Sequence, residues 1–150
     1  MPPRGAPPAA WTWNRCGGCS SPPRSSIPVG LDRELRGKSA GLRTHAVVAA
    51  ASAALGYLSV ATATSQGEDA TRIASQVVTG IGFMGAGVIF ASQGRVHGLT
   101  TAAALWSAMA TGLCVGMGAT GLALALVAVT LLLLGPVNWV SDVMVSRWHP

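Results

Sequence analysis

The feature that most constrains this chain is a run of 19 residues without a charge, from Ile73 to Ala91. At about 1.5 Å per residue, a helix of that length crosses the roughly 30 Å hydrocarbon core of a bilayer. The run contains four glycines, and its small residues recur at helical spacing, at Ser75, Thr79, Gly82 and Ala86. A stripe of this kind lets another helix backbone approach closely. We therefore predict that this run is the central helix of a tight membrane bundle.

Composition supports a membrane protein of one domain. The chain has 150 residues, of which 50% are apolar and only 10% are charged, whereas about a quarter of the residues are charged in soluble domains. The net charge is +5, and most of the basic residues lie in the first 43 positions, before any apolar run. A basic flank beside membrane helices sets orientation. We therefore expect no nucleic-acid partner.

Hydropathy predicts an all-α, multi-pass transmembrane helix bundle within residues 29–140, followed by a short tail over 141–150. The first 16 residues of this domain, 29–44, read as a polar loop, and Ser92–Gly98 reads as a second one. Gly112 and Gly116 have the GxxxG spacing of closely packed membrane helices. The last span is almost purely aliphatic and is expected to face lipid. The four predicted spans lie near residues 45–63, 73–91, 99–117 and 118–135.

The first 28 residues are predicted to be a disordered tail, because they are rich in proline, glycine and serine and show no apolar period. Cys16 and Cys19 have the spacing of a zinc knuckle, but no second pair of ligands follows, so free thiols are expected. A gene-model artefact is an alternative origin for this tail. With a cytoplasmic N-terminus, four crossings would leave nine basic residues inside and only Arg72 outside, which satisfies the positive-inside rule.

The residues give little support for catalysis. No nucleophile is paired with a base in a recognisable pattern, so we expect neither an enzyme nor a bound cofactor. Magnesium prefers oxygen ligands, which makes Glu68 and Asp69 weak candidate ligands, although adjacent carboxylates at a helix start are more often a solvated turn. The polar side chains of the spans either line a polar path or form hydrogen bonds between helices; these are Gln76, Thr79, Thr100 and Thr101.

Three motifs occur in order along the chain. The first is Gly30-Leu31-Asp32-Arg33-Glu34, which is followed by Ala40-Gly41-Leu42-Arg43-Thr44. The second runs from Arg72 to Gly87 and reads Arg-Ile-Ala-Ser-Gln-Val-Val-Thr-Gly-Ile-Gly-Phe-Met-Gly-Ala-Gly. The third is Gly98-Leu99-Thr100-Thr101-Ala102-Ala103-Ala104-Leu105-Trp106. All three resemble the motifs of the MgtC/SapB family of bacterial membrane proteins, and the resemblance covers roughly residues 29–138.

The resemblance implies a multi-pass protein of the bacterial inner membrane that is linked to survival at low magnesium and, in pathogens, inside host cells. It implies regulation of another membrane protein, with the ATP synthase or a sensor kinase as partner; magnesium transport, with magnesium as ligand or signal, is the alternative. A homo-oligomer is compatible with both. The motif positions expected to carry function are Arg72, Gln76, Gly80, Gly82, Gly85, Gly87, Thr100, Thr101 and Trp106.

The chain departs from the family pattern in two places. The family has five spans, and the first of them ends in the Gly-Leu-Asp-Arg-Glu motif, whereas residues 1–28 here are polar and rich in proline. We expect that this first helix is missing, which leaves a truncated, inactive remnant as a third functional hypothesis. Longer relatives also carry a soluble C-terminal domain, for which this sequence has no counterpart.

Overall fold

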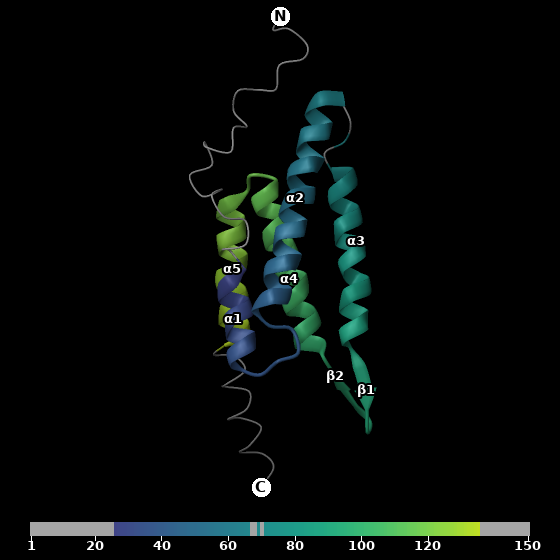
Figure 1. Cartoon of the computed structure of the whole chain (residues 1–150), viewed down its shortest axis with the longest axis vertical. Helices are drawn as coiled ribbons and strands as arrows, with labels where there is room; N and C mark the ends of the chain where they lie inside the picture. The colour runs from purple at the N-terminus through teal and green to yellow at the C-terminus, as the bar shows by residue number, and fades with distance from the viewer. Residues whose placement is uncertain (1–25, 67–68, 70, 136–150) are drawn as a thin grey trace, which may run out of the picture.

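A computed structural model describes residues 26–66, 69 and 71–135 of the chain. Within these residues the chain is mostly helical, as the sequence predicts, and two short strands form an antiparallel hairpin (Figure 1). The elements in chain order are α1 (Ile27–Leu35), α2 (Leu42–Gln66), α3 (Thr71–Val88), β1 (Phe90–Ser92), β2 (Arg95–His97), α4 (Leu99–Gly116) and α5 (Thr120–Leu134).

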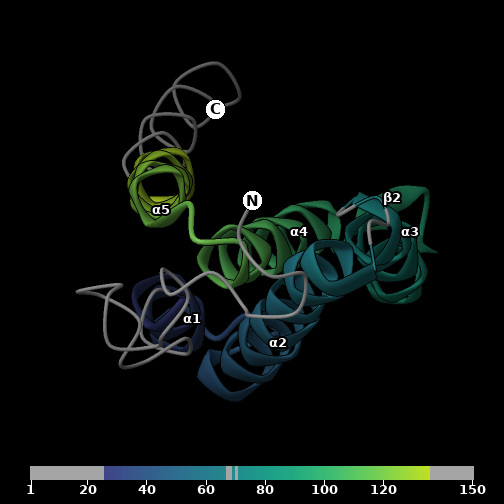
Figure 2. The same cartoon turned by 90° about the horizontal axis from the view of Figure 1, so that it is seen from above.

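Helix α4 is the central element of the bundle, because it packs against α2, α3 and α5. The view along the bundle shows α3 and α5 on opposite sides of the α2–α4 pair (Figure 2). The expectation of a central helix at residues 73–91 is therefore wrong, since α3 lies at the edge. Short helix α1 packs against α2 and α5. Its presence also corrects the predicted loop at 29–44, the first part of which is helical.

The core lies along α4. Leu105 and Met109 are each 1% exposed, and they form one cluster with Ala108 and with side chains from α2 and α3. A second cluster joins α4 to the outer helices through Val29 of α1 and Val127 of α5. The small residues of the core let the backbones approach, which replaces the hydrophobic effect as the source of packing energy in lipid.

The closest approach in the bundle is between α2 and α4. A Cβ atom added to Gly112 would overlap the carbonyl oxygen of Ala49, and one added to Gly116 would overlap that of Ala53. On the facing helix, a Cβ on Gly56 would lie 2.9 Å from the carbonyl oxygen of Leu113. The GxxxG pair identified in the sequence is thus where α4 packs most closely against another helix, and that helix is α2.

Two of the four predicted spans are long and apolar enough to cross a membrane, namely Leu42–Ala63 of α2 and Leu99–Gly116 of α4. Helix α5 is apolar but shorter, with 15 residues. Helix α3 ends at Val88, before the predicted end at Ala91, because the chain then enters the hairpin.

The hairpin replaces the loop predicted at Ser92–Gly98. Its two-residue turn consists of Gln93 and Gly94, with φ angles of 50° and 74°, the conformation that matches the twist of the flanking strands. Gly98, with a φ of 88°, then leads into α4, and its Cα lies so close to the Val88 carbonyl that a side chain would collide with it. Glutamine is uncommon at positive φ, so the sequence carries only a weak turn signal here.

Candidate functional site

Most of the residues that the sequence nominates lie on α3, and the small-residue stripe of this helix is exposed at Ser75, Thr79, Gly82 and Ala86. Gly80, Gly82 and Gly87 are exposed, and a Cβ added to any of them would meet no atom within 4 Å. Gly85 is half-buried and would meet only the Cβ of Ala102, at 3.8 Å. The small-residue stripe therefore faces away from the bundle, and α3 packs inward through other positions, chiefly Ala74 and Ile81.

The hydroxyl groups on this face form hydrogen bonds within α3. Ser75 Oγ donates to the carbonyl oxygen of Arg72 at 2.8 Å, and Thr79 Oγ1 donates to that of Ser75 at 3.1 Å. Hydroxyls satisfied in this way can lie in lipid or against another helix without an unpaired donor. The face thus combines small residues, which permit a close approach, with polar groups that need no water.

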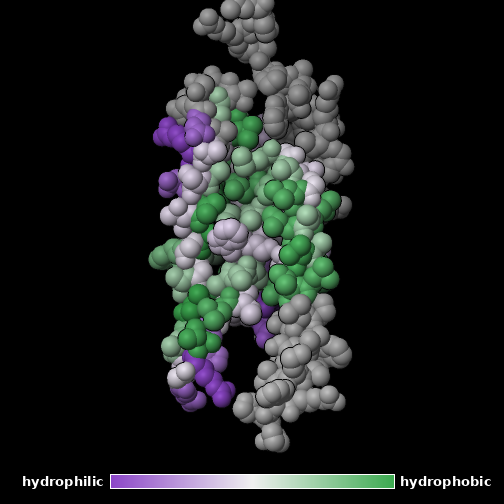
Figure 3. Space-filling view, turned by 180° about the vertical axis from the view of Figure 1, so that it is seen from behind, coloured by the Kyte–Doolittle hydropathy of each residue, from purple (hydrophilic) through white to green (hydrophobic). Residues whose placement is uncertain are grey.

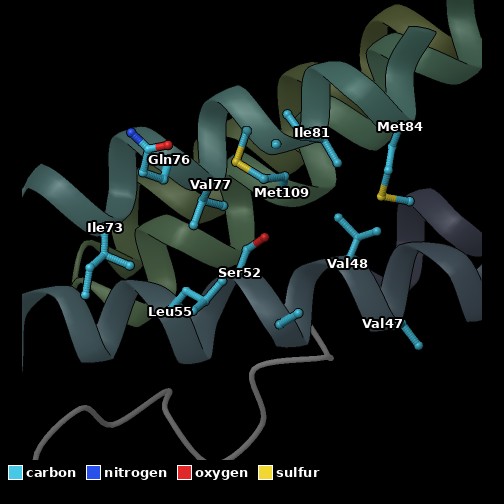
Figure 4. A pocket seen from close by; sticks show the side chains of 12 residues that line it. Val47, Val48, Ser52, Leu55, Ile73, Gln76, Val77, Ile81, Met84 and Met109 are labelled. Carbon is cyan, nitrogen blue, oxygen red and sulfur yellow. The ribbon is translucent and has the colours of Figure 1, made fainter. Parts of the chain in front are cut away.

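An open groove of about 480 Å³ separates α3 from α2 (Figure 4). Ser52 and Gln76 are the only polar side chains among its lining residues, and the others are aliphatic residues, methionines and Gly80. Met109 of α4 also contributes to the lining. The groove brings Gln76 and Gly80 to one place, and its chemistry suits an apolar chain more than an ion.

Arg72 and Asp69 lie together at the start of α3. Asp69 Oδ1 accepts hydrogen bonds from the Thr71 amide at 2.9 Å and from the Thr71 hydroxyl at 2.8 Å. These bonds, and to a smaller extent the charge of Arg72, lower the pKa of Asp69. The carboxylate thus acts as a helix cap. Among the described residues no three His, Cys, Asp or Glu side chains gather as a metal site, and Glu68 lies outside that part of the chain.

The cap gives a pH prediction for the start of α3. Because folding lowers the pKa of Asp69 below its ordinary value of 3.8, the stabilisation from this cap is complete above pH 3.8 and is lost as the pH falls through the lower pKa of the folded state. We expect the Thr71 amide to exchange its hydrogen several-fold more slowly in the wild type than in Asp69→Ala at pH 6.

This difference should vanish well below pH 3.8, where the wild-type carboxyl is protonated. Hydrogen exchange followed by mass spectrometry measures both proteins at each pH, so the intrinsic pH dependence of exchange cancels in their ratio. Equal exchange at pH 6 would contradict the capping role.

A second cluster of motif residues is buried where α1 meets α4. Arg33 is 2% exposed, and its Nη2 donates a hydrogen bond to Oγ1 of Thr101, which is 4% exposed. Burial lowers the pKa of Arg33, while neighbouring Asp32 raises it. Since an arginine stays protonated in proteins, the cluster holds a buried cation. The sequence nominates Thr101 but not Arg33, although Arg33 lies in the Gly-Leu-Asp-Arg-Glu motif.

The other residues of the first motif hold α1 against α2. Glu34 accepts a hydrogen bond from the backbone amide of Leu42 at 2.8 Å, so it caps the N-terminus of α2. His45 is fully buried, and its Nδ1 donates to the Gly41 carbonyl oxygen at 2.9 Å. A Cβ on Gly30 would lie 2.9 Å from the Cα of Leu42, which explains why the motif has a glycine there. The motif therefore joins three helices.

The remaining nominated residues, Thr100 and Trp106, lie neither on α3 nor in the buried cluster of Arg33 and Thr101. Thr100 is exposed, and Trp106 is 50% exposed on α4. The polar contact between α4 and α5 comes instead from residues that were not nominated, because Ser107 Oγ lies 2.5 Å from Thr130 Oγ1. Of the polar residues proposed as interhelical contacts, Thr101 forms such a bond and Thr79 bonds within its own helix.

The surface hydropathy is banded. Hydrophobic side chains cover the middle of the face opposite to that of Figure 1, and hydrophilic ones gather towards its two ends (Figure 3). Large exposed apolar side chains occur on α2, α3, α4 and α5; examples are Leu58, Phe83, Trp106 and Leu124. This distribution fits a bundle whose middle lies in hydrocarbon.

Comparison with known proteins places these motifs in context. Residues 25–143 match the MgtC family. The chain is 42% identical over 112 residues to the "Putative magnesium transporter YhiD" of Escherichia coli strain K12, covering 71% of this chain and 52% of that protein. It is 42% identical over 90 residues to "Protein MgtC" of Brucella abortus strain 2308, covering 60% of this chain and 37% of the relative.

"Protein MgtC" of Salmonella typhimurium strain LT2 is 43% identical over 90 residues, which cover 60% of this chain and 38% of the relative. The matched parts thus span about half of these curated relatives, or less. No solved structure matches the chain.

Proposed function

This chain belongs to the MgtC family, and we propose that it is a multi-pass inner-membrane protein that acts in adaptation to low magnesium by binding and regulating another membrane protein. The observation that carries this proposal is the exposed small-residue face of α3. Helix α3 holds the longest of the three family motifs, yet a Cβ added to any of its glycines would meet no atom of α2 or α4 closer than 3.8 Å.

The glycines of α4 and those of α3 differ in what surrounds them. In α4, Gly112 and Gly116 face α2, and their lack of a side chain makes the packing possible. In α3, Gly80, Gly82 and Gly87 could each be replaced by alanine without a clash; Gly82 lies on the exposed stripe, whereas Gly80 lines the groove beside α2. Glycine in a helix interior costs about 1 kcal/mol relative to alanine. A partner helix that approaches as closely as α2 approaches α4 would account for that cost.

We place α2, α3, α4 and α5 in the membrane in this proposal. Helices α2 and α4 have the length and apolarity of spans, and α3 and α5 run beside them over much of the same length (Figure 1). The face of α3 then meets lipid or a transmembrane helix of the partner. The ATP synthase and a membrane sensor kinase are the partners to test first, and self-association through the same face is the homo-oligomeric form of the proposal.

Magnesium transport is the second candidate function. It is favoured by the name of the Escherichia coli relative and by the position of Gln76 on the groove between α2 and α3. Transport predicts magnesium flux into liposomes that falls when Gln76 is replaced by leucine. Regulation predicts no flux from folded, inserted protein.

The deciding variant for regulation is Gly82→Leu. We expect it to reduce co-purification of the membrane partner at least tenfold, because a leucine on the open face blocks close approach of a second helix. Its melting temperature should stay close to that of the wild type, since nothing lies within 4 Å of Gly82. Cross-linking in cells followed by quantitative mass spectrometry measures the partner.

Gly121→Leu is the matched control, because Gly121 is also an exposed helical glycine with no atom within 4 Å of an added Cβ, but lies on α5. Partner recovery should be retained in this control. If both variants keep the partner, or both lose it, the α3 face is not the docking site.

A further inference from the structure

The hairpin β1–β2 projects beyond the ends of α3 and α4 (Figure 1), and every residue of its two strands is exposed. Helix α4 begins at Leu99, directly after the second strand, and it is one of the two helices with the length and apolarity of a span. A membrane-crossing α4 therefore places the hairpin where the helix leaves the hydrocarbon, at the level of the headgroups.

The strand register gives the hairpin two chemically different faces. Phe90 pairs with His97, and Ser92 pairs with Arg95, so these four side chains share one face. The Phe90 and His97 rings stack at 5.4 Å, which is consistent with this assignment. Ala91 and Val96 form the other pair, and side-chain alternation places them on the opposite face. One face is thus cationic and aromatic, and the other is apolar.

The apolar side chains of the hairpin have no cover within the described bundle. Phe90 is 59% exposed and Val96 is 57% exposed. Leu99, at the start of α4, is exposed to the same extent as Val96. Aromatic and aliphatic side chains beside an arginine are typical of the membrane interface, where the apolar parts enter the acyl region and the cation stays with the phosphates.

The charge at this end of the molecule is complementary to an anionic surface. The connection between α1 and α2 lies at the same end as the hairpin (Figure 1), and Lys38 and Arg43 beside it are exposed. The nearby carboxylates are engaged, because Asp32 pairs with Arg36 at 2.8 Å and Glu34 caps α2. The unengaged charge on this end of the described chain is therefore positive.

We propose that the hairpin is a docking surface for anionic phospholipid headgroups, with Arg95 as the main contact. The guanidinium of Arg95 pairs with the lipid phosphate, because its planar donors match phosphate oxygens in a bidentate arrangement. Phe90, on the same face as Arg95, enters the boundary of the acyl chains, which selects a lipid over a soluble phosphate. This inference is independent of the partner that α3 binds.

The test uses the full purified chain in a neutral detergent with equal amounts of phosphatidylglycerol and phosphatidylcholine. Native mass spectrometry counts the lipids that stay bound. We expect the wild type to retain phosphatidylglycerol preferentially, and Arg95→Gln to lower this preference about fivefold, as expected for one basic residue at an anionic surface. Arg95→Lys should keep most of the preference, because it keeps the charge.

Arg72→Gln is the matched control, since it removes one exposed positive charge from the opposite end of α3, away from the hairpin. The lipid preference of this control should stay within twofold of the wild type. The proposal is overturned if Arg95→Gln binds lipids as the wild type does, or if Arg72→Gln loses as much as Arg95→Gln. Displacement of phosphatidylglycerol by 10 mM inorganic phosphate would overturn it as well. Circular dichroism confirms the fold of each variant, which is expected to persist because Arg95 is exposed.

Discussion

Gly112→Leu is expected to prevent the bundle from assembling. The Cβ of any residue at this position would overlap the carbonyl oxygen of Ala49, and that atom belongs to the backbone of α2 and cannot rotate away. The two helices would have to separate along their closest contact, which also includes Gly116 and Gly56. We expect a loss of about 3 kcal/mol or more, at or beyond the upper end of ordinary overpacking. Thermal unfolding in detergent and protease resistance in membranes measure it.

A smaller side chain at position 112 should destabilise the bundle less than leucine does. Gly112→Ala adds only the Cβ and should already destabilise the bundle, by less than the leucine variant does. Gly121→Ala adds the same atom to an open position on α5 and should be neutral or slightly stabilising, because alanine favours the helix. A Gly112→Ala protein that melts at or above the temperature of Gly121→Ala would refute the close contact between α2 and α4.

Thr101→Val is expected to destabilise the protein by about 2 kcal/mol. Valine has nearly the same shape as threonine, but it removes the hydroxyl that accepts a hydrogen bond from Arg33. Arg33 is 2% exposed, so its guanidinium would lose a partner that water cannot replace. Thr101→Ser keeps the hydroxyl and should cost much less. Denaturant titration in detergent, with the helical signal as readout, gives the free energy of unfolding.

A double-mutant cycle distinguishes this bond from general packing. In an Arg33→Met background no cation is left without a partner, so Thr101→Val should cost little there. The expected coupling between the two positions is about 2 kcal/mol, close to the whole effect of Thr101→Val. Strictly additive effects would show that Arg33 and Thr101 do not stabilise each other.

Four of the five described helices could be predicted from the sequence because each has a local signal, whereas α1 lies in a stretch predicted to be a loop. Apolar runs without charges predict α2, α4 and α5, and the spacing of Gly112 and Gly116 predicts close packing before the structure is known. The capping role of Asp69 is also a local pattern, since two carboxylates precede a helical run. These features depend on residues a few positions apart, and the sequence displays them directly.

The parts that could not be predicted depend on distant residues. The burial of Arg33 arises from contact with Thr101, 68 positions away, and nothing near Arg33 distinguishes it from the exposed Arg36 and Arg43. The outward direction of the α3 stripe, Ser75, Thr79, Gly82 and Ala86, has the same cause, because a small-residue stripe looks alike whether its partner is in the same chain or in another. The order of helices around α4 is likewise a property of the whole bundle.

The pairing of α2 with α4 also fixes the order in which the protein is assembled during synthesis. Gly56 leaves the ribosome 56 residues before Gly112, which is about 3 to 11 s at bacterial and eukaryotic elongation rates of roughly 5–20 residues per second. During that interval the tight face of α2 has no partner, although α3 has already been synthesised. The nascent chain therefore passes through a state in which α2 can be captured by other helices or by membrane insertion factors. This state ends once α4 has been synthesised, because Gly112 and Gly116 can then pack against α2.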